Sequence, residues 1–337
     1  MRAFVVTAPR VAGVQLVDDP TPGADDLVVD VERVGICGTD VELYSGEMAY
    51  LDQGITTFPI RLGHEWVGTV SAVGSAAHEH WIGKRVTGDT MLGCGHCRYC
   101  LGGHQHVCPE RREVGITDGW PGALAERLLI PARFALEIPP SVTLTAAALV
   151  EPAGNSLRAV EATQLSPGEP LLILGSGTIG LLAAQIALAR RLEVHIAGER
   201  LSSLSLARSL GVEHTHSFDE LEGRAYAAVI DATSSVSAPA LALKLVDRAG
   251  RVVFIGLSGT PSLVDTREIA LKDVTAVGIL SASPGLAGAI ELFASGAVVP
   301  DTLVAEVVGL DAVGERLEGR RGPEAGPGPK VHVDPRL

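Results

Sequence analysis

The chain has 337 residues, of which 46% are hydrophobic and 20% charged, the composition of a globular protein with room for two domains. Its formal net charge of −13 at pH 7 argues against nucleic acid and anionic membrane surfaces as partners. No apolar run of signal-peptide length follows Met1, so we expect a cytoplasmic protein.

Short β-rich runs at residues 3–7 and 27–34 alternate with turn signals rich in proline, glycine and aspartate. This pattern predicts a twisted, largely antiparallel domain at the start of the chain. Cys37 follows these runs, and His64 comes 27 residues later. Each alone is better explained as a packed core residue. They are too far apart for a local zinc knuckle, but two neighbouring elements could direct both side chains at one point.

Four of the five cysteines lie within fifteen residues, in the pattern C-x2-C-x2-C-x7-C. They are Cys94, Cys97, Cys100 and Cys108. In a cytoplasmic chain such crowding indicates a metal site rather than disulfides. Four thiolates complete a closed tetrahedral zinc site of the structural kind. An iron–sulfur cluster also takes four thiolates, but the last spacing of seven does not match the ferredoxin motif.

A glycine-rich turn follows the four apolar residues 171–174 and precedes an apolar helical pattern that runs to residue 189. The turn consists of Gly175, Ser176, Gly177, Thr178, Ile179 and Gly180. In a G-x-G-x-x-G motif the first glycine makes the tight turn, the second lets the backbone approach a pyrophosphate, and the third lets helix and strand pack closely. Residues 171–189 are uncharged and long enough for a membrane span, but the glycines favour a nucleotide-binding turn. Further strands at 194–197, 228–231, 251–256 and 275–278 alternate with helical stretches, which predicts a parallel sheet.

The residues after the second of these strands bear on the choice of cofactor. Gly198 stands where NAD-binding sites carry an acidic residue, and Arg200 could neutralise the 2′-phosphate of NADP. Glu199, however, could bind a ribose hydroxyl and would repel a phosphate. These residues are compatible with either NAD or NADP as the cofactor, and they favour NADP slightly.

Five motifs occur in a familiar order: C-G-T-D at 37–40, G-H-E at 63–65, the cysteine pattern, L-V-E-P at 149–152 and the glycine turn. In this combination the chain resembles the zinc-dependent medium-chain dehydrogenases of the alcohol dehydrogenase superfamily, in the sorbitol (polyol) or threonine dehydrogenase branch. The resemblance implies an α/β protein with a mostly β, GroES-like catalytic domain at 1–150 and 285–337, including a structural zinc lobe at about 93–109. A Rossmann domain with a doubly wound parallel sheet is expected at 151–284, and a homo-oligomer (dimer or tetramer) is expected.

The resemblance also implies a second, catalytic zinc. Its ligands would be Cys37, His64 and Glu151, with Glu65 as an alternative ligand or a residue behind the ligands. Asp40 would accept the other N–H of His64, and the Thr39 hydroxyl would bind the alcohol and begin the proton relay. Glu42 stands where alcohol-type relatives have a relay histidine, so the route of the proton stays open.

The function implied is zinc-dependent hydride transfer between a secondary alcohol and NAD(P). The alcohol would be a polyol or a sugar-derived alcohol, bound to zinc as the alkoxide. One alternative is oxidation of a β-hydroxy-amino acid in the manner of L-threonine 3-dehydrogenase, which needs a cation for the carboxylate. Another is a zinc-less quinone reductase-like or non-enzymatic nucleotide-binding relative, against which the three zinc ligands argue. The remaining histidines His195, His214, His216 and His332 are predicted to be surface or packed residues rather than ligands.

Overall fold

The computed structural model describes residues 1–117 and 119–337. They form two compact units, the first consisting of Met1–Glu151, Pro300–Gly326 and Lys330–Leu337, and the second of Pro152–Val299 and Pro327–Pro329. Residues 285–299, which the sequence assigned to the first unit, therefore group with the second. The reason is packing: Gly288 lies against Leu157, and the backbone N–H of Val299 donates to Gln185 Oε1 over 3.3 Å.

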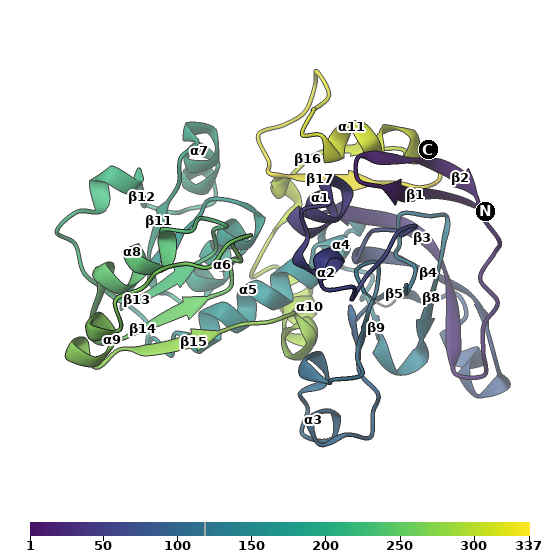
Figure 1. Ribbon diagram of the computed structural model, residues 1–337, viewed down its shortest axis with the longest axis horizontal. Helices are drawn as coiled ribbons and strands as arrows, with labels where there is room; N and C mark the ends of the chain where they lie inside the picture. The colour runs from purple at the N-terminus through teal and green to yellow at the C-terminus, as the bar shows by residue number, and fades with distance from the viewer. Residues whose placement is uncertain (118) are drawn as a thin grey trace. The chain divides into compact units, whose positions relative to one another are not determined.

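The first unit is built around a seven-stranded sheet, which confirms the expected mostly β domain (Figure 1). Its strands run in the order β16 (Val304–Val308), β17 (Lys330–Val333), β3 (Asp26–Ile36), β4 (Glu65–Val73), β5 (Arg85–Gly88) and β9 (Ala135–Glu137), and β8 (Arg127–Pro131) also pairs with β3. All pairings are antiparallel except β16 with β17. Because side chains alternate along β3, one set of residues, including Leu27, Val29 and Val31, enters a core with Trp66 and Leu128.

Shorter elements complete the first unit. Two small antiparallel pairs are formed by β1 (Arg2–Ala8) with β2 (Val11–Leu16) and by β6 (Met91–Leu92) with β7 (Arg112–Glu113). The helices are α1 (Gly38–Ser45), α2 (Ala49–Asp52), α3 (Arg98–Leu101), α4 (Leu144–Ala148) and α11 (Val313–Leu317), and α5 (Val150–Ala162) begins here. The register pairs Gly35 of β3 with Glu65 of β4 and with His332 of β17. The C-terminal strand is thereby placed beside the segment that leads to Cys37.

The second unit contains a six-stranded parallel sheet in the order β12, β11, β10, β13, β14, β15 (Figure 1). The strands are β10 (Pro170–Leu174), β11 (Glu193–Ala197), β12 (His214–His216), β13 (Tyr226–Asp231), β14 (Val246–Phe254) and β15 (Thr275–Gly278). The helices are α6 (Thr178–Ala189), α7 (Leu201–Ser209), α8 (Ala238–Leu245), α9 (Thr266–Lys272) and α10 (Leu286–Ala294). From β10 the chain builds the sheet outward to β12, then returns to the other side of β10 with β13, so the strand order reverses there. This confirms the predicted doubly wound fold.

The apolar segment 171–189 is divided between β10, the glycine turn and the twelve-residue helix α6. None of the described helices is both long enough and apolar enough to cross a membrane. The sequence missed one strand of this sheet, β12, which has three residues and contains two histidines.

Candidate active site

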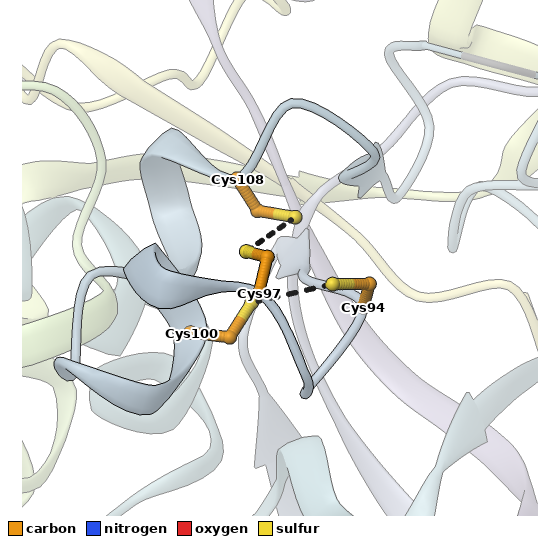
Figure 2. A group of neighbouring side chains, drawn as sticks. All are labelled: Cys94, Cys97, Cys100 and Cys108. Atoms are coloured by element: carbon orange, nitrogen blue, oxygen red, sulfur yellow. Dashed lines mark hydrogen bonds between the residues drawn. The ribbon is translucent and has the colours of Figure 1, made fainter.

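The four clustered cysteines converge in one lobe of the first unit (Figure 2). The Sγ atoms of Cys94 and Cys100 are 3.9 Å apart, those of Cys97 and Cys108 are 3.7 Å apart, and all four lie within 4.8 Å of one another. Four sulfurs bound to zinc at about 2.3 Å in a tetrahedron would be separated by about 3.8 Å. All four are free thiols. The spacing therefore fits a closed structural zinc site and is too long for disulfides.

The four thiols differ in acidity when no ion is bound. A hydrogen bond from the backbone N–H of Cys100 lowers the pKa of Cys97 to about 7, whereas burial raises the pKa of Cys100 to about 12. The four sulfurs would thus not all be thiolates near pH 7 by themselves. A coordinated metal ion deprotonates such thiols.

A second cluster joins Cys37, His64 and Glu65, whose ligand atoms lie within 4.8 Å of one another. Cys37 precedes α1 as its N-cap, and its Sγ accepts a hydrogen bond from the backbone N–H of Thr39 over 3.4 Å. Glu65 is the first residue of β4 and His64 directly precedes it, and both are buried. A thiolate, an imidazole and a carboxylate are the donors that zinc takes in proteins, so the set fits the ion that the sequence predicted.

Asp40 connects the two segments that carry this cluster. Its Oδ2 accepts the backbone N–H of Cys37 at 2.9 Å, and its Oδ1 accepts the backbone N–H of Gly63 at 3.1 Å. The predicted hydrogen bond to His64 is instead a 3.6 Å approach of His64 Nδ1 to Oδ1. Burial opposes a charge on His64, but the Cys37 thiolate and Asp40 outweigh it and raise the pKa of His64 well above its usual value. With Nδ1 facing Asp40, Nε2 is the atom left to bind a metal.

Lys330 is the residue of this cluster that the sequence did not reveal. Its Nζ donates to both carboxylate oxygens of Glu65, at 2.8 and 2.7 Å, and to the carbonyl of Ile36 at 3.1 Å. Both charged side chains are almost completely buried. Burial works against the charge on Lys330, but Glu65, with a smaller contribution from Cys37, raises the lysine pKa. Lys330 and Glu65 are 265 residues apart, and the sole local signal was a lysine opening the apolar strand K-V-H-V.

The predicted roles of Glu151 and Thr39 in zinc binding and proton transfer stay predictions. Glu151 is buried in the first turn of α5, but it is not a member of the group formed by Cys37, His64 and Glu65. Thr39 is half-buried in the first turn of α1. On the same helix, burial raises the pKa of Glu42, with a contribution from the charge of Glu47.

The glycine turn has the conformation that phosphate binding requires. Gly175 has a φ of +105°, which strongly favours glycine, and Gly180 packs directly on the carbonyl of Gly175. Gly177 is the N-cap of α6, and a side chain there would project into open space. The amino end of α6, with Thr178 and Ile179 in its first turn, is therefore accessible to a pyrophosphate.

The end of β11 carries the residues that bear on the choice of cofactor. A Cβ atom at Gly198 would clash with Ser176, coming within 2.8 Å of its Cβ. An aspartate is therefore incompatible with Ser176 in its present position. Glu199 and Arg200 follow, and both are exposed.

A pocket of about 300 Å³ opens near the carboxyl ends of β13 and β14. Its lining includes Asp231, Thr233, Phe254, Gly256 and Val264. Burial raises the pKa of Asp231, whose Oδ1 accepts hydrogen bonds from the backbone N–H and the hydroxyl of Thr233. Ligands of doubly wound sheets bind at this edge, so the pocket extends the candidate cofactor site beyond the residues predicted from the sequence.

Comparison with known proteins agrees with this geometry. Residues 23–140 match the family described as alcohol dehydrogenase GroES-like domain, and residues 178–295 match zinc-binding dehydrogenase. The L-threonine 3-dehydrogenase of Pectobacterium carotovorum is 32% identical over 304 residues, which cover 83% of each chain.

Two solved structures are similar over 99% of both chains. A zinc-binding dehydrogenase from Sinorhizobium meliloti 1021 bound to NADP has a TM-score of 0.89 at 30% identity. The alcohol dehydrogenase of Thermus sp. ATN1 has a TM-score of 0.88 at 25% identity. The chain belongs to the zinc-dependent medium-chain dehydrogenases of the alcohol dehydrogenase superfamily, a family of oxidoreductases, as the sequence motifs indicated.

Proposed function

We propose that this protein oxidises a small secondary alcohol to the corresponding carbonyl compound, with NAD(P)⁺ accepting the hydride and one proton released. The observation that carries the proposal is that Cys37, His64 and Glu65, which belong to two separate sequence motifs, converge on one point. The accessible amino end of α6 supports it, because a nicotinamide dinucleotide needs such a phosphate site.

The zinc would be held by Cys37 and His64 together with a carboxylate, for which Glu151 and Glu65 are the candidates. When bound, zinc supplies a Lewis acid that makes a hydroxyl group more acidic, as it lowers the pKa of water from 15.7 to about 7. The nicotinamide supplies the hydride acceptor.

The protein's own residues hold these groups in place. Asp40 fixes the backbone of both ligand segments through Cys37 and Gly63. Lys330 neutralises Glu65 and keeps its carboxylate directed toward the ammonium group. The Thr39 hydroxyl forms no hydrogen bond with another described residue, so it is available to accept the proton of the substrate hydroxyl and pass it on.

The preferred substrates are polyols or sugar-derived alcohols, because a carboxylate at position 151 replaces the cysteine of alcohol-type relatives. L-Threonine is the second candidate, since relatives that are L-threonine 3-dehydrogenases match 83% of the chain. A cation for its carboxylate is offered by Arg61, three residues before His64. Burial lowers the pKa of Arg61 to about 10, and its buried Nε has no hydrogen-bond partner among the described residues.

A substrate panel tests the proposal. The zinc-loaded protein is incubated with NAD⁺ or NADP⁺ and a set of polyols, simple secondary alcohols and L-threonine, and reduced nicotinamide is measured by absorbance. We expect turnover with at least one secondary alcohol. If L-threonine is the substrate, Arg61→Met raises its KM and leaves the KM of a neutral alcohol unchanged. Absence of hydride transfer with every compound would refute the proposal.

Two cysteine variants separate the catalytic from the structural role of zinc. We expect about two zinc ions per wild-type chain. Cys37→Ser should lose one ion and at least about a hundredfold in kcat/KM, because Lewis-acid stabilisation amounts to several kcal/mol. Cys97→Ser should lose the other ion. A Cys37→Ser variant with full activity would support the zinc-less class of relative instead.

A further inference from the structure

Three histidines that no motif explained meet at the edge of the parallel sheet in the second unit. His195 lies in β11, and His214 and His216 lie in β12, the edge strand. The register pairs His195 directly with His214. Because side chains two residues apart in a strand share a face, His214, His216, His195 and Glu193 all project from the same side of the two strands.

The side chains form a connected group. Nε2 of His195 lies 2.9 Å from Oε1 of Glu193, and Nδ1 of His195 lies 3.0 Å from Nε2 of His216. The rings of His195 and His214 are stacked, with centroids 4.4 Å apart and planes 14° apart. One ligand atom from each of Glu193, His195 and His214 lies within 4.8 Å of the others. His195 and His216 are buried and His214 is exposed, as the prediction of packed or surface histidines has it, but the sequence did not predict that the three would be neighbours.

We propose that Glu193, His195 and His214 form a binding site for a divalent transition-metal ion such as Ni²⁺. Two imidazoles and one carboxylate are the donors that such ions prefer, and they leave a further coordination position for water. Ligand atoms bound at about 2.1 Å in a tetrahedron are separated by about 3.4 Å. The Nε2 of His195 and the Glu193 carboxylate, now 2.9 Å apart, thus move apart by a fraction of an ångström to admit an ion, and the exposed ring of His214 rotates out of its stack on His195 to direct a nitrogen at the same ion.

His216 is a positioning residue in this site. Its Nε2 lies beside Nδ1 of His195 and can accept a proton held there, so that when an ion replaces the Nε2–H···Glu193 hydrogen bond, the Nε2 lone pair of His195 is directed in its ring plane toward the side of Glu193. Metal-binding histidines are commonly oriented by such a partner. His195 and His216 are buried, and Tyr226 contacts the His195 ring edge-on, so their orientation is restrained by packing as well.

The group has one buried and one exposed side. Glu193 provides the one carboxylate of the group, and His214 is exposed. The site is therefore open to solvent on one side and rigid on the other.

This site is separate from the candidate cofactor site. Glu193 opens β11, and His195 follows two residues later, whereas the glycine turn and Gly198 follow the carboxyl ends of β10 and β11. A bound ion would join β12 to β11 by a cross-strand link. We expect it to stabilise the edge of the sheet and to leave hydride transfer unaffected.

Nickel titration tests the proposal. Protein already loaded with zinc at its cysteine-containing sites is titrated with Ni²⁺ in a calorimeter, and wild type, His214→Ala and His80→Ala are compared. His80 is an exposed histidine of the first unit, so its variant controls for loss of a surface imidazole. We expect one Ni²⁺ per wild-type chain, unchanged binding in His80→Ala, and affinity at least tenfold weaker in His214→Ala.

Two further measurements separate a metal site from a structural contact. His216→Leu should weaken Ni²⁺ binding about 10- to 100-fold, while His216→Gln, which keeps an acceptor, should lose less. Ni²⁺ should raise the Tm of wild type and of His80→Ala but not that of His214→Ala. Dehydrogenase activity should be equal in all three, so failure of this proposal is distinguishable from failure of the proposed function. No saturable Ni²⁺ binding by wild type, or equal binding by His214→Ala, would overturn it.

Discussion

The pair formed by Lys330 and Glu65 places two charges in the interior beside the candidate zinc ligands. Their side chains are 4% and 3% exposed, so each has lost nearly all of its hydration. A buried ion pair gains little net stability relative to an apolar pair, but removing one partner leaves an uncompensated buried charge. The main role of the pair is therefore to position the Glu65 carboxylate relative to Cys37 and His64, and its contribution to net stability is small.

We predict that Lys330→Met lowers the free energy of unfolding by about 3–5 kcal/mol, since Glu65 then has no countercharge. The double variant Lys330→Met/Glu65→Leu should recover most of that loss. Urea unfolding at fixed zinc concentration measures both. The exposed pair Lys84–Glu137, with a 2.6 Å contact, supplies the control: Lys84→Met should cost less than about 1 kcal/mol. Equal losses in the two lysine variants would show that Glu65 does not depend on Lys330.

The sequence revealed the residues whose motifs are local and concealed those whose partners are distant. Cys94 to Cys108 are close in sequence, so their convergence was predictable from spacing alone. Cys37 and His64 required the resemblance, because nothing in the 26 residues between them indicates that their side chains meet. The contact of Lys330 with Glu65 depends on the pairing of β17 with β3, which links the two ends of the chain and leaves no periodic signal.

At the level of elements, the strand–turn–helix formed by β10, the glycine turn and α6 was predictable because each part has a strong pattern. Four apolar residues predict a buried strand, and the glycine positions follow from the phosphate geometry. In contrast, β12 is three residues long and polar on one face, H-T-H. It is a strand because β11 offers it a hydrogen-bonding edge, and short strands of this kind carry no periodicity of their own. The histidine group was missed for the same reason.

The connection from β11 to α7 determines the expected choice of cofactor. Gly198 packs on Ser176, so an acidic residue cannot occupy the position from which it would bind the ribose hydroxyls. Arg200 is the N-cap of α7 and is exposed, which places a solvent-exposed cation one residue beyond Glu199. The absence of the first acid and the presence of this arginine favour a 2′-phosphate.

We predict that kcat/KM is higher with NADP⁺ than with NAD⁺, and that Arg200→Ala reduces it for NADP⁺ by about tenfold or more, since a charge-assisted hydrogen bond is worth about 1.5–3 kcal/mol. The value for NAD⁺ should change little. Arg208→Ala, which removes an exposed arginine from the last turn of the same helix, is the matched control. Unchanged use of NADP⁺ by Arg200→Ala would show that Arg200 does not contact the phosphate.

At the level of the whole molecule, each unit has a hydrophobic core of its own. Trp66, Leu27 and Leu128 belong to the core of the first unit, and Leu172 and Val229 belong to that of the second. The zinc lobe lies entirely within the first unit, whereas the glycine turn lies within the second. The general division into two domains followed from the motif order. The second boundary did not, because α10 shows an amphipathic pattern that would suit either core.

We therefore predict two unfolding transitions in calorimetry, one for each unit. Cys97→Ser should lower the midpoint temperature of the first unit's transition and leave that of the second unit unchanged. The reason is that a structural zinc contributes its binding energy to the domain in which it is bound. NADP⁺ at a hundred times its Kd should stabilise the unit that carries the glycine turn by about 2.7 kcal/mol. A single transition that responds equally to the variant and to NADP⁺ would mean that the two cores unfold as one cooperative structure. In that case loss of the structural zinc would weaken the cofactor-binding unit as well, and NADP⁺ affinity in Cys97→Ser would fall with it.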